Sequence, residues 1–211
     1  MNRSIALFFS AACHPLLLPS YLFYLVCYQL PGIVQYPVQP NRLQLTGLVA
    51  LFTFVLPSVG TAVLLWTGVI RGSIELRERQ QRPLPLLLAT LCFGAANVLL
   101  TSGPNAIDAL LGHMLVGMTL AVGLTLAVSL RWKISAHGVG VGGAVGLLAV
   151  LYVRDASNMS TLGWLLLSIL LAGAVLSARL ALNAHTPAQV WAGFALGAGL
   201  VLGLSIGLTV A

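Results

Sequence analysis

The sequence predicts an all-α integral membrane protein, a bundle of six or seven transmembrane helices. Apolar residues make up 59% of the 211 residues and charged residues only 7%, with a mean hydropathy of +1.00. A soluble domain carries about 25% charged residues, so lipid rather than water is the main solvent. The apolar runs are continuous over about 20 residues instead of alternating over about 10, which favours helices over the strands of a transmembrane barrel. One transmembrane domain, residues 1–211, accounts for the length.

The net charge of +6 does not indicate a nucleic-acid partner, because the basic residues lie in short loops between apolar runs. Membrane topology accounts for some of them, and an anionic substrate accounts for the rest. The cysteines Cys13, Cys27 and Cys92 lie within apolar runs and lack metal-ligand spacing. We interpret them as small apolar fillers and expect no disulfide framework.

Seven apolar segments follow one another along the chain, at residues 4–30, 45–70, 84–101, 106–130, 138–153, 161–180 and 188–210. His14, Pro15 and Pro19 interrupt the first segment. It is therefore either a kinked span or a segment whose beginning lies along the interface. Six and seven spans are both compatible with this pattern.

The connections between the segments alternate in character. Those after the first, third and fifth segments contain turn-forming residues, whereas those after the second, fourth and sixth contain clusters of polar residues. Alternate connections of a membrane bundle lie on the same face. The three polar clusters are therefore expected to share one face, whether or not the first segment spans the membrane.

Glycines recur at a spacing of four residues in the last part of the chain. The fifth and seventh segments contain these series: Gly138, Gly142 and Gly146, then Gly199, Gly203 and Gly207. Small residues at this spacing let helices approach closely. We expect both series to serve helix packing and neither to bind a ligand.

The first polar cluster occupies residues 75–83. If it is helical, Arg79 and Arg82 share a face, and Glu75 lies four residues before Arg79 and can pair with it. Pro83 suits the first turn of the next helix, which brings Arg82 near the positive end of that helix. The alternative is a basic loop end that anchors the helix at lipid head groups.

The second cluster, residues 133–137, directly precedes the glycine-rich fifth segment. It contains Lys133, Ser135 and His137. A hydroxyl, small residues and exposed backbone amides at a helix start form a plausible anion site, and His137 could donate a proton. An interfacial histidine without a role is the alternative.

The third cluster, residues 179–189, is the most specific of the three. Thr186 fits a helix N-cap, Pro187 the first helical position and Gln189 the reciprocal partner of a capping box. His185 would then precede the positive end of the last helix, where a phosphate held against its ring is stabilised. Arg179 lies at the other side of the same turn.

Two further histidines are predicted to be structural. His113 lies within the fourth segment, away from the clusters, and is expected to bond to another helix. His14 is interpreted as a kink or packing residue.

Together the clusters resemble the three signature motifs of the type-2 phosphatidic acid phosphatase superfamily. The first family motif is a lysine, six residues and Arg-Pro; here Arg82 and Pro83 match and Glu75 replaces the lysine. The second is Pro-Ser-Gly-His, which here is the stretch 134–137, Ile-Ser-Ala-His.

The third family motif is Ser-Arg, five residues, a histidine, three residues and an aspartate. Here it is represented by Ala178 and Arg179, then His185, then Gln189. The order of the motifs and their internal spacing agree with the family.

The resemblance implies a metal-independent, acid-phosphatase-type hydrolase that forms a phosphohistidine and uses no cofactor. His185 would attack phosphorus, and His137 would protonate the leaving oxygen. The side chains that would hold the phosphoryl oxygens are Arg82, Arg179, Ser135, Arg79 and Lys133. Fixed cations in a poorly solvated site lower the barrier to this reaction.

Two departures from the family pattern affect this site. Arg79 or Arg77, on the same loop, could replace the lysine whose place Glu75 takes. The aspartate whose place Gln189 takes orients the nucleophile in the family, as carboxylates do in other triads. The Gln189 oxygen can accept a proton from the ring without supplying charge, or the side chain could serve the capping box alone. A carboxylate from Glu75 or Glu78 could also substitute.

The expected partners are membrane lipids and a lipid phosphate or diphosphate substrate, with phosphatidate-like lipids, polyprenyl diphosphates and lipid A phosphates all open. The excess of basic residues would place the clusters in the cytoplasm. The resemblance instead favours the periplasmic side of a bacterial inner membrane, which we adopt. The alternatives are a catalytically impaired relative that binds anionic lipid head groups, a small membrane structural protein, and a transporter.

Overall fold

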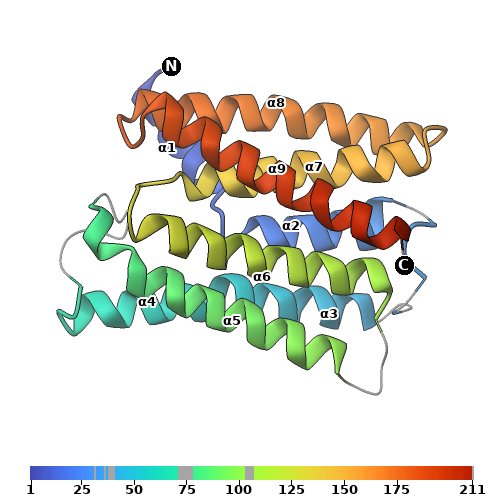
Figure 1. Ribbon diagram of the computed structural model, residues 1–211, viewed down its shortest axis with the longest axis horizontal. Helices are drawn as coiled ribbons and strands as arrows, with labels where there is room; N and C mark the ends of the chain where they lie inside the picture. Colours follow the sequence, from blue (N-terminus) through green and yellow to red (C-terminus); the bar gives the residue numbers. More distant parts are fainter. Residues whose placement is uncertain (31, 36, 38–40, 71–77, 103–106, 211) are drawn as a thin grey trace. The chain divides into compact units, whose positions relative to one another are not determined.

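The computed structural model describes residues 1–30, 32–35, 37, 41–70, 78–102 and 107–210, excluding the side chains of 206–210. In these ranges the regular structure is helical and contains no strand (Figure 1). Six helices in this part of the chain are long and apolar enough to cross a membrane. They correspond to the second through seventh predicted segments. The all-α membrane fold is therefore confirmed, and the chain is an integral membrane protein.

The backbone contacts divide the chain into two compact units. The first consists of Met1–Leu18 and Ile134–Ala211, and the second of Pro19–Lys133. The prediction that the whole chain forms one domain stays a prediction.

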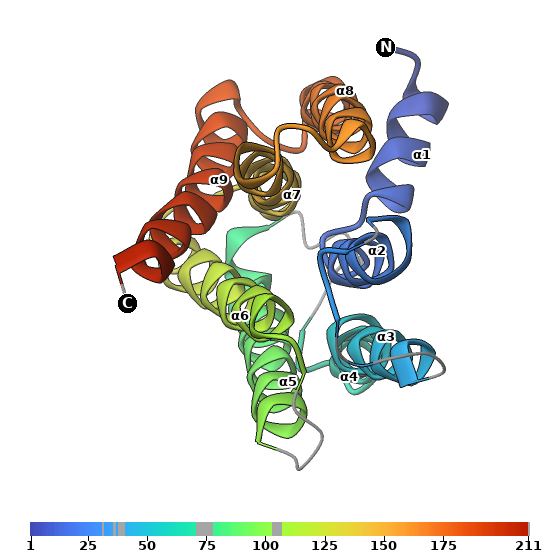
Figure 2. The ribbon, with the colours of Figure 1, turned by 90° about the vertical axis from the view of Figure 1, so that its right-hand side faces the viewer.

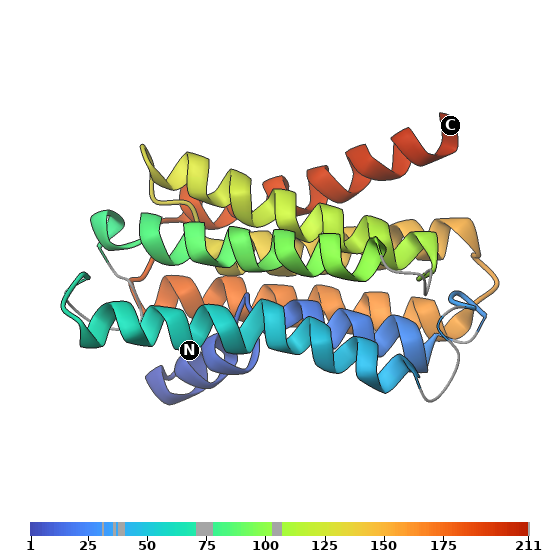
Figure 3. The same ribbon diagram turned by 90° about the horizontal axis from the view of Figure 1, so that it is seen from below.

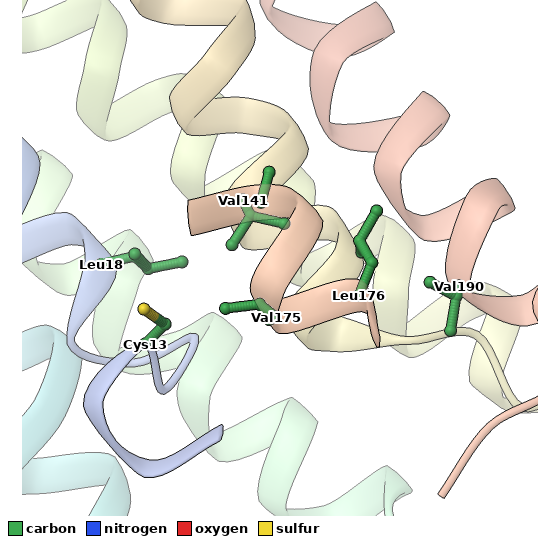
Figure 4. Packing of buried hydrophobic residues seen from close by; sticks show 7 residues of the cluster. Cys13, Leu18, Val141, Val175, Leu176 and Val190 are labelled. Carbon is green, nitrogen blue, oxygen red and sulfur yellow. The ribbon is translucent and has the colours of Figure 1, made fainter. Parts of the chain in front are cut away.

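The first unit contains α1 (Arg3–Ala12), α7 (Ala136–Arg154), α8 (Met159–Ala181) and α9 (Pro187–Val210). Helix α7 lies between α8 and α9, and α1 packs against α8 (Figure 2). Their core includes Cys13, Leu18, Val141, Ala172, Val175, Leu176 and Val190 (Figure 4). Cys13 is a free thiol in this core, as expected of an apolar filler.

The glycine series of α7 packs against α9, which agrees with its predicted role in helix packing. A Cβ added at Gly138 would lie 2.7 Å from the carbonyl oxygen of Val190, and one at Gly146 would lie 3.2 Å from the Cα of Ala198. The backbones of α7 and α9 are therefore in direct contact here. Glycine permits this contact, because a larger side chain on α7 would hold the two helices apart.

The glycine series predicted for the last helix is the wrong one. A Cβ at Gly199 or Gly203 would meet nothing within 4 Å, whereas one at Gly193 would lie 2.5 Å from the carbonyl oxygen of Ser135. Gly197 likewise faces the backbone of α7. Several four-residue series run along this glycine-rich helix, and its start beside Ser135 decides which of them meets α7.

The second unit contains α2 (Leu18–Tyr24), α3 (Asn41–Ala50), α4 (Leu56–Trp66), α5 (Pro83–Thr101) and α6 (Ala109–Ser129). Helices α5 and α6 pack side by side (Figure 3). The π-helical turn η2 (Leu51–Val55) joins α3 to α4 as one continuous helix. It immediately precedes α4, whose second residue is Pro57, and a π-turn at this point accommodates the hydrogen bond that proline cannot make.

The first predicted segment is broken into short pieces. Helix α1 ends at Ala12, α2 begins at Leu18, and the π-helical turn η1 (Leu25–Gln29) follows. His14 and Pro15 lie in the break, where proline stops the helix.

His113 bonds within its own helix. Its Nδ1 contacts the carbonyl oxygen of Ala109, one turn earlier in α6. The predicted structural role is compatible with this contact, but the predicted partner on another helix is wrong, because the preceding turn lies closer to the ring.

Candidate functional site

The turn between α8 and α9 is closed by backbone hydrogen bonds. The N–H of Asn183 donates to the carbonyl of Leu180 at 2.9 Å, and the N–H of Ala184 donates to that of Arg179 at 3.1 Å. This pair of bonds is a Schellman motif, which requires a left-handed residue after the helix. Asn183 supplies it with φ of +51°. The spacing between Arg179 and His185 is therefore set by the way α8 ends.

The predicted capping box is present at the start of α9. The N–H of Gln189 donates to Thr186 Oγ1 at 3.4 Å, and the N–H of Thr186 donates to Gln189 Oε1 at 3.2 Å. Pro187 is the first residue of the helix. These reciprocal bonds satisfy two amides that the first helical turn would leave without partners.

Gln189 also contacts His185. Its Oε1 lies 3.1 Å from His185 Nδ1. The backbone N–H of Thr186 can only donate, so the amide atom that it faces must be the oxygen, and His185 Nδ1 must then be a donor as well. The neutral ring consequently carries its proton on Nδ1, and Nε2 is its unprotonated nitrogen. Gln189 therefore completes the capping box and also contacts the His185 ring.

Backbone atoms connect the second cluster to the third. Ser135 caps α7, since its buried hydroxyl accepts from the N–H of Gly138 at 3.2 Å. The N–H of Ser135 donates to the carbonyl oxygen of Gln189, also at 3.2 Å. These two clusters therefore meet at one end of the first unit, as the alternation of the connections predicted.

His137 contacts the N-terminal helix. Its Nε2 lies 3.0 Å from the carbonyl oxygen of Ser10, which can only accept, so Nε2 carries a proton. Nη1 of Arg179 donates to the hydroxyl of the same serine at 3.2 Å. The ring of His14 packs edge-on against that of His137, with centroids 5.7 Å apart.

These charged and titratable groups are close enough to influence one another. His137 lies within electrostatic range of Arg179, His14 and His185. Burial lowers the pKa of His14 below its ordinary value, and the positive charge of Arg179 lowers it further. The arrangement therefore favours the neutral form of His14.

Three predicted phosphate ligands belong to the second unit. Arg79 donates through its guanidinium to the carbonyl of Leu130, just after α6. Arg82 is buried and directly precedes α5. Lys133 is the last residue of this unit.

Of the two carboxylates that could substitute for the family's aspartate, only that of Glu78 lies within the described residues. Glu78 lies in the second unit, where its carboxylate accepts from Gln81 Nε2 at 3.1 Å. Glu75, like Arg77, lies outside the described residues. Within the described ranges, no three His, Cys, Asp or Glu side chains gather as metal ligands.

Sequence reasoning did not find Ser10 and interpreted His14 as a kink or packing residue. Ser10 lies 127 positions before His137 and 169 before Arg179, and no local spacing signals contacts of that length. The available hint was a serine in the last turn before the break at His14 and Pro15.

The first unit thus gathers three imidazoles, a guanidinium and the amino ends of α7 and α9. Helix amino ends attract anions through their unpaired amides and dipoles, and an imidazole with an unprotonated Nε2 is a nucleophile. Comparison of the chain with protein-family models, curated proteins and solved structures gave no match. The case for a function therefore rests on these side chains and on the motif resemblance.

Proposed function

We propose that this protein is a membrane phosphatase that hydrolyses a lipid phosphate or diphosphate at the bilayer surface through a phosphohistidine. The observation that carries the proposal is the bond from His185 Nδ1 to Gln189 Oε1. It leaves Nε2 as the nucleophilic atom, at the amino end of α9, where a phosphate is stabilised. The motif resemblance to the type-2 phosphatidic acid phosphatases supports the same assignment.

In the first step His185 Nε2 attacks phosphorus, and the bond between phosphorus and the leaving oxygen breaks. His137 gives that oxygen its proton. Because Nε2–H of His137 is directed at a carbonyl, the proton would be exchanged through Nδ1. Water then attacks the phosphohistidine, His137 takes back a proton, and inorganic phosphate leaves. Arg179 would stabilise charge on the phosphoryl oxygens throughout.

Tryptophans at both ends of the first unit support a site at head-group depth. Trp191, two residues after Gln189, is 60% exposed, and tryptophan prefers the membrane–water interface. Trp164 lies near the opposite end, at the start of α8. From Trp164 to Arg179 the helix rises about 22 Å, which is shorter than the apolar part of a bilayer, about 30 Å thick.

The remaining parts of the proposal depend on the resemblance. We extend it to a site on the periplasmic side of a bacterial inner membrane, and to phosphate-binding roles for Arg82, Arg79 and Lys133. Alanine variants of these three residues test those roles one at a time. Replacement of a side chain that binds phosphate should slow turnover without lowering thermal stability.

The test is phosphate release by the protein purified in detergent without added metal. Phosphatidic acid, a polyprenyl diphosphate and a lipid A precursor are the substrates, and a radiolabelled phosphoryl group is trapped by rapid denaturation at alkaline pH. We expect release and trapped label from the parent and from His113→Gln, but neither from His185→Ala. If the folded parent binds these lipids and releases no phosphate, the protein is instead a binder of anionic head groups.

A further inference from the structure

Two groups of the proposed site meet on a single residue of α1. Ser10 lies in the last turn of that helix, where backbone carbonyls lack a partner within the helix. Its carbonyl accepts from His137 Nε2 at 3.0 Å, and its hydroxyl accepts from Arg179 Nη1 at 3.2 Å. Ser10 is 8% exposed, so water does not compete freely for either contact.

We propose that Ser10 is a positioning residue of this site: its carbonyl fixes the tautomer of His137, and its hydroxyl aims the guanidinium of Arg179. The catalytic consequence rests on the proposed phosphatase function. The contacts themselves do not.

The carbonyl decides which nitrogen of His137 can exchange a proton with a substrate. A carbonyl oxygen only accepts, so the neutral ring keeps its proton on Nε2 and presents Nδ1 as the exchanging atom. His14, packed edge-on against the ring, opposes its rotation into another orientation. The ring is therefore held by a hydrogen bond on one side and an aromatic contact on another.

The end of α1 also suits the charges that it meets. A helix carboxyl end carries partial negative charge, which favours a cation beside it. Arg179 reaches this end from α8, and His137 reaches it from the first turn of α7. Helix α1 packs on α8, so the break after Ala12 allows a short helix to end at the site instead of continuing past it.

Removal of the hydroxyl alone isolates half of the proposal. Ser10→Ala keeps the backbone carbonyl and the small volume, but Arg179 loses its hydrogen bond to this hydroxyl. Hydrogen bonds to charged groups contribute enough that kcat/KM should fall roughly tenfold to a hundredfold. The fall should lie mainly in kcat, because aim matters most when charge develops on the phosphoryl oxygens.

The matched control is Ser4→Ala, which removes an exposed hydroxyl from the same helix. We expect the control to retain the kcat/KM of the parent and Ser10→Thr to recover most of the activity lost in Ser10→Ala. Values for Ser10→Ala within twofold of Ser4→Ala would overturn the role of the hydroxyl.

The carbonyl half is tested by ¹⁵N NMR of histidine-labelled protein in detergent at pH 8. His137, assigned by its absence in His137→Gln, should show a protonated Nε2 and an unprotonated Nδ1. The reverse pattern would overturn the proposal. This spectrum does not depend on turnover, so it decides the contact even if the parent releases no phosphate, an outcome that would refute only the phosphatase function. The Arg179 Nε–H signal, which should shift or broaden in Ser10→Ala but not in Ser4→Ala, tests the hydroxyl in the same way.

Discussion

Replacement of Gly193 by alanine should loosen the contact between α7 and α9 and disturb the site with it. The new Cβ would lie 2.5 Å from the Ser135 carbonyl oxygen and 3.2 Å from the Val139 nitrogen. To reach ordinary contact the helices must separate by about 0.9 Å, and a gap of that size forfeits roughly a quarter to a half of the attraction between facing atoms. Both obstructing atoms belong to the backbone, so no side chain can rotate away.

The magnitude follows from two opposing terms. Alanine gains about 1 kcal/mol over glycine within a helix, and overpacking costs about 1–3 kcal/mol. Because the obstructing atoms are backbone atoms, the overpacking cost lies at the upper end of this range. Gly193→Ala should therefore be about 2 kcal/mol less stable than the parent. For a chain of this length that corresponds to a fall in Tm of about 4–8 °C.

Gly199→Ala is the matched control on the same helix, because a Cβ at this position would meet no atom within 4 Å. It should keep the parent Tm or raise it by a few degrees, about 2–4 °C. Thermal unfolding in detergent measures both variants, and phosphate release should fall in Gly193→Ala alone. Equal Tm values for the two variants would refute the close packing on which the reasoning depends.

Three further predictions concern the site and its turn. Gln189→Glu keeps an oxygen at the same reach and adds negative charge to the first turn of α9, so its Tm should equal or slightly exceed that of the parent. Gln189→Ala should lower the stability by about 1 kcal/mol, because the capping bonds are lost. An equal Tm for the two variants would contradict the bonds to Thr186 and His185. Asn183→Gly should be tolerated, but Asn183→Val should destabilise the protein by about 1–2 kcal/mol, because a β-branched residue opposes the left-handed backbone. Similar denaturation curves for these two variants would show that the turn can rearrange. Burial, and then the charge of Arg179, lower the pKa of His14. The unfolded chain therefore binds more protons at this residue, and stability falls as pH drops below the ordinary histidine pKa of about 6.5. His14→Gln should show a smaller fall in Tm than the parent between pH 7.5 and 5.5, roughly the range of histidine titration.

The parts of the site that the sequence predicted are those fixed by local chemistry. The capping box formed by Thr186 and Gln189 depends on residues three positions apart, and the turn between Arg179 and His185 spans only a few residues. The packing role of Gly138 also followed from a short spacing. Each is decided within one or two helical turns, where side-chain type and spacing carry the information.

The parts that were missed are decided by tertiary contact. Ser10 has no distinguishing neighbour in the sequence, and its importance comes from the side chains that α7 and α8 direct at the end of α1. The packing face of α9 was likewise assigned to Gly199 instead of Gly193, because a helix rich in glycine offers several equivalent series. Only the position at which α9 meets Ser135 distinguishes them.

The hydrogen bond from the Ser135 N–H to the Gln189 carbonyl has a consequence for mutational tolerance. Both partners are main-chain atoms, so the register between the two clusters does not depend on which side chains occupy these positions. Position 189 can therefore change its chemical character while this main-chain link between the two clusters is kept. A scaffold of this kind lets a carboxylate and an amide be exchanged beside the His185 ring without a change in the main-chain register that joins the two clusters.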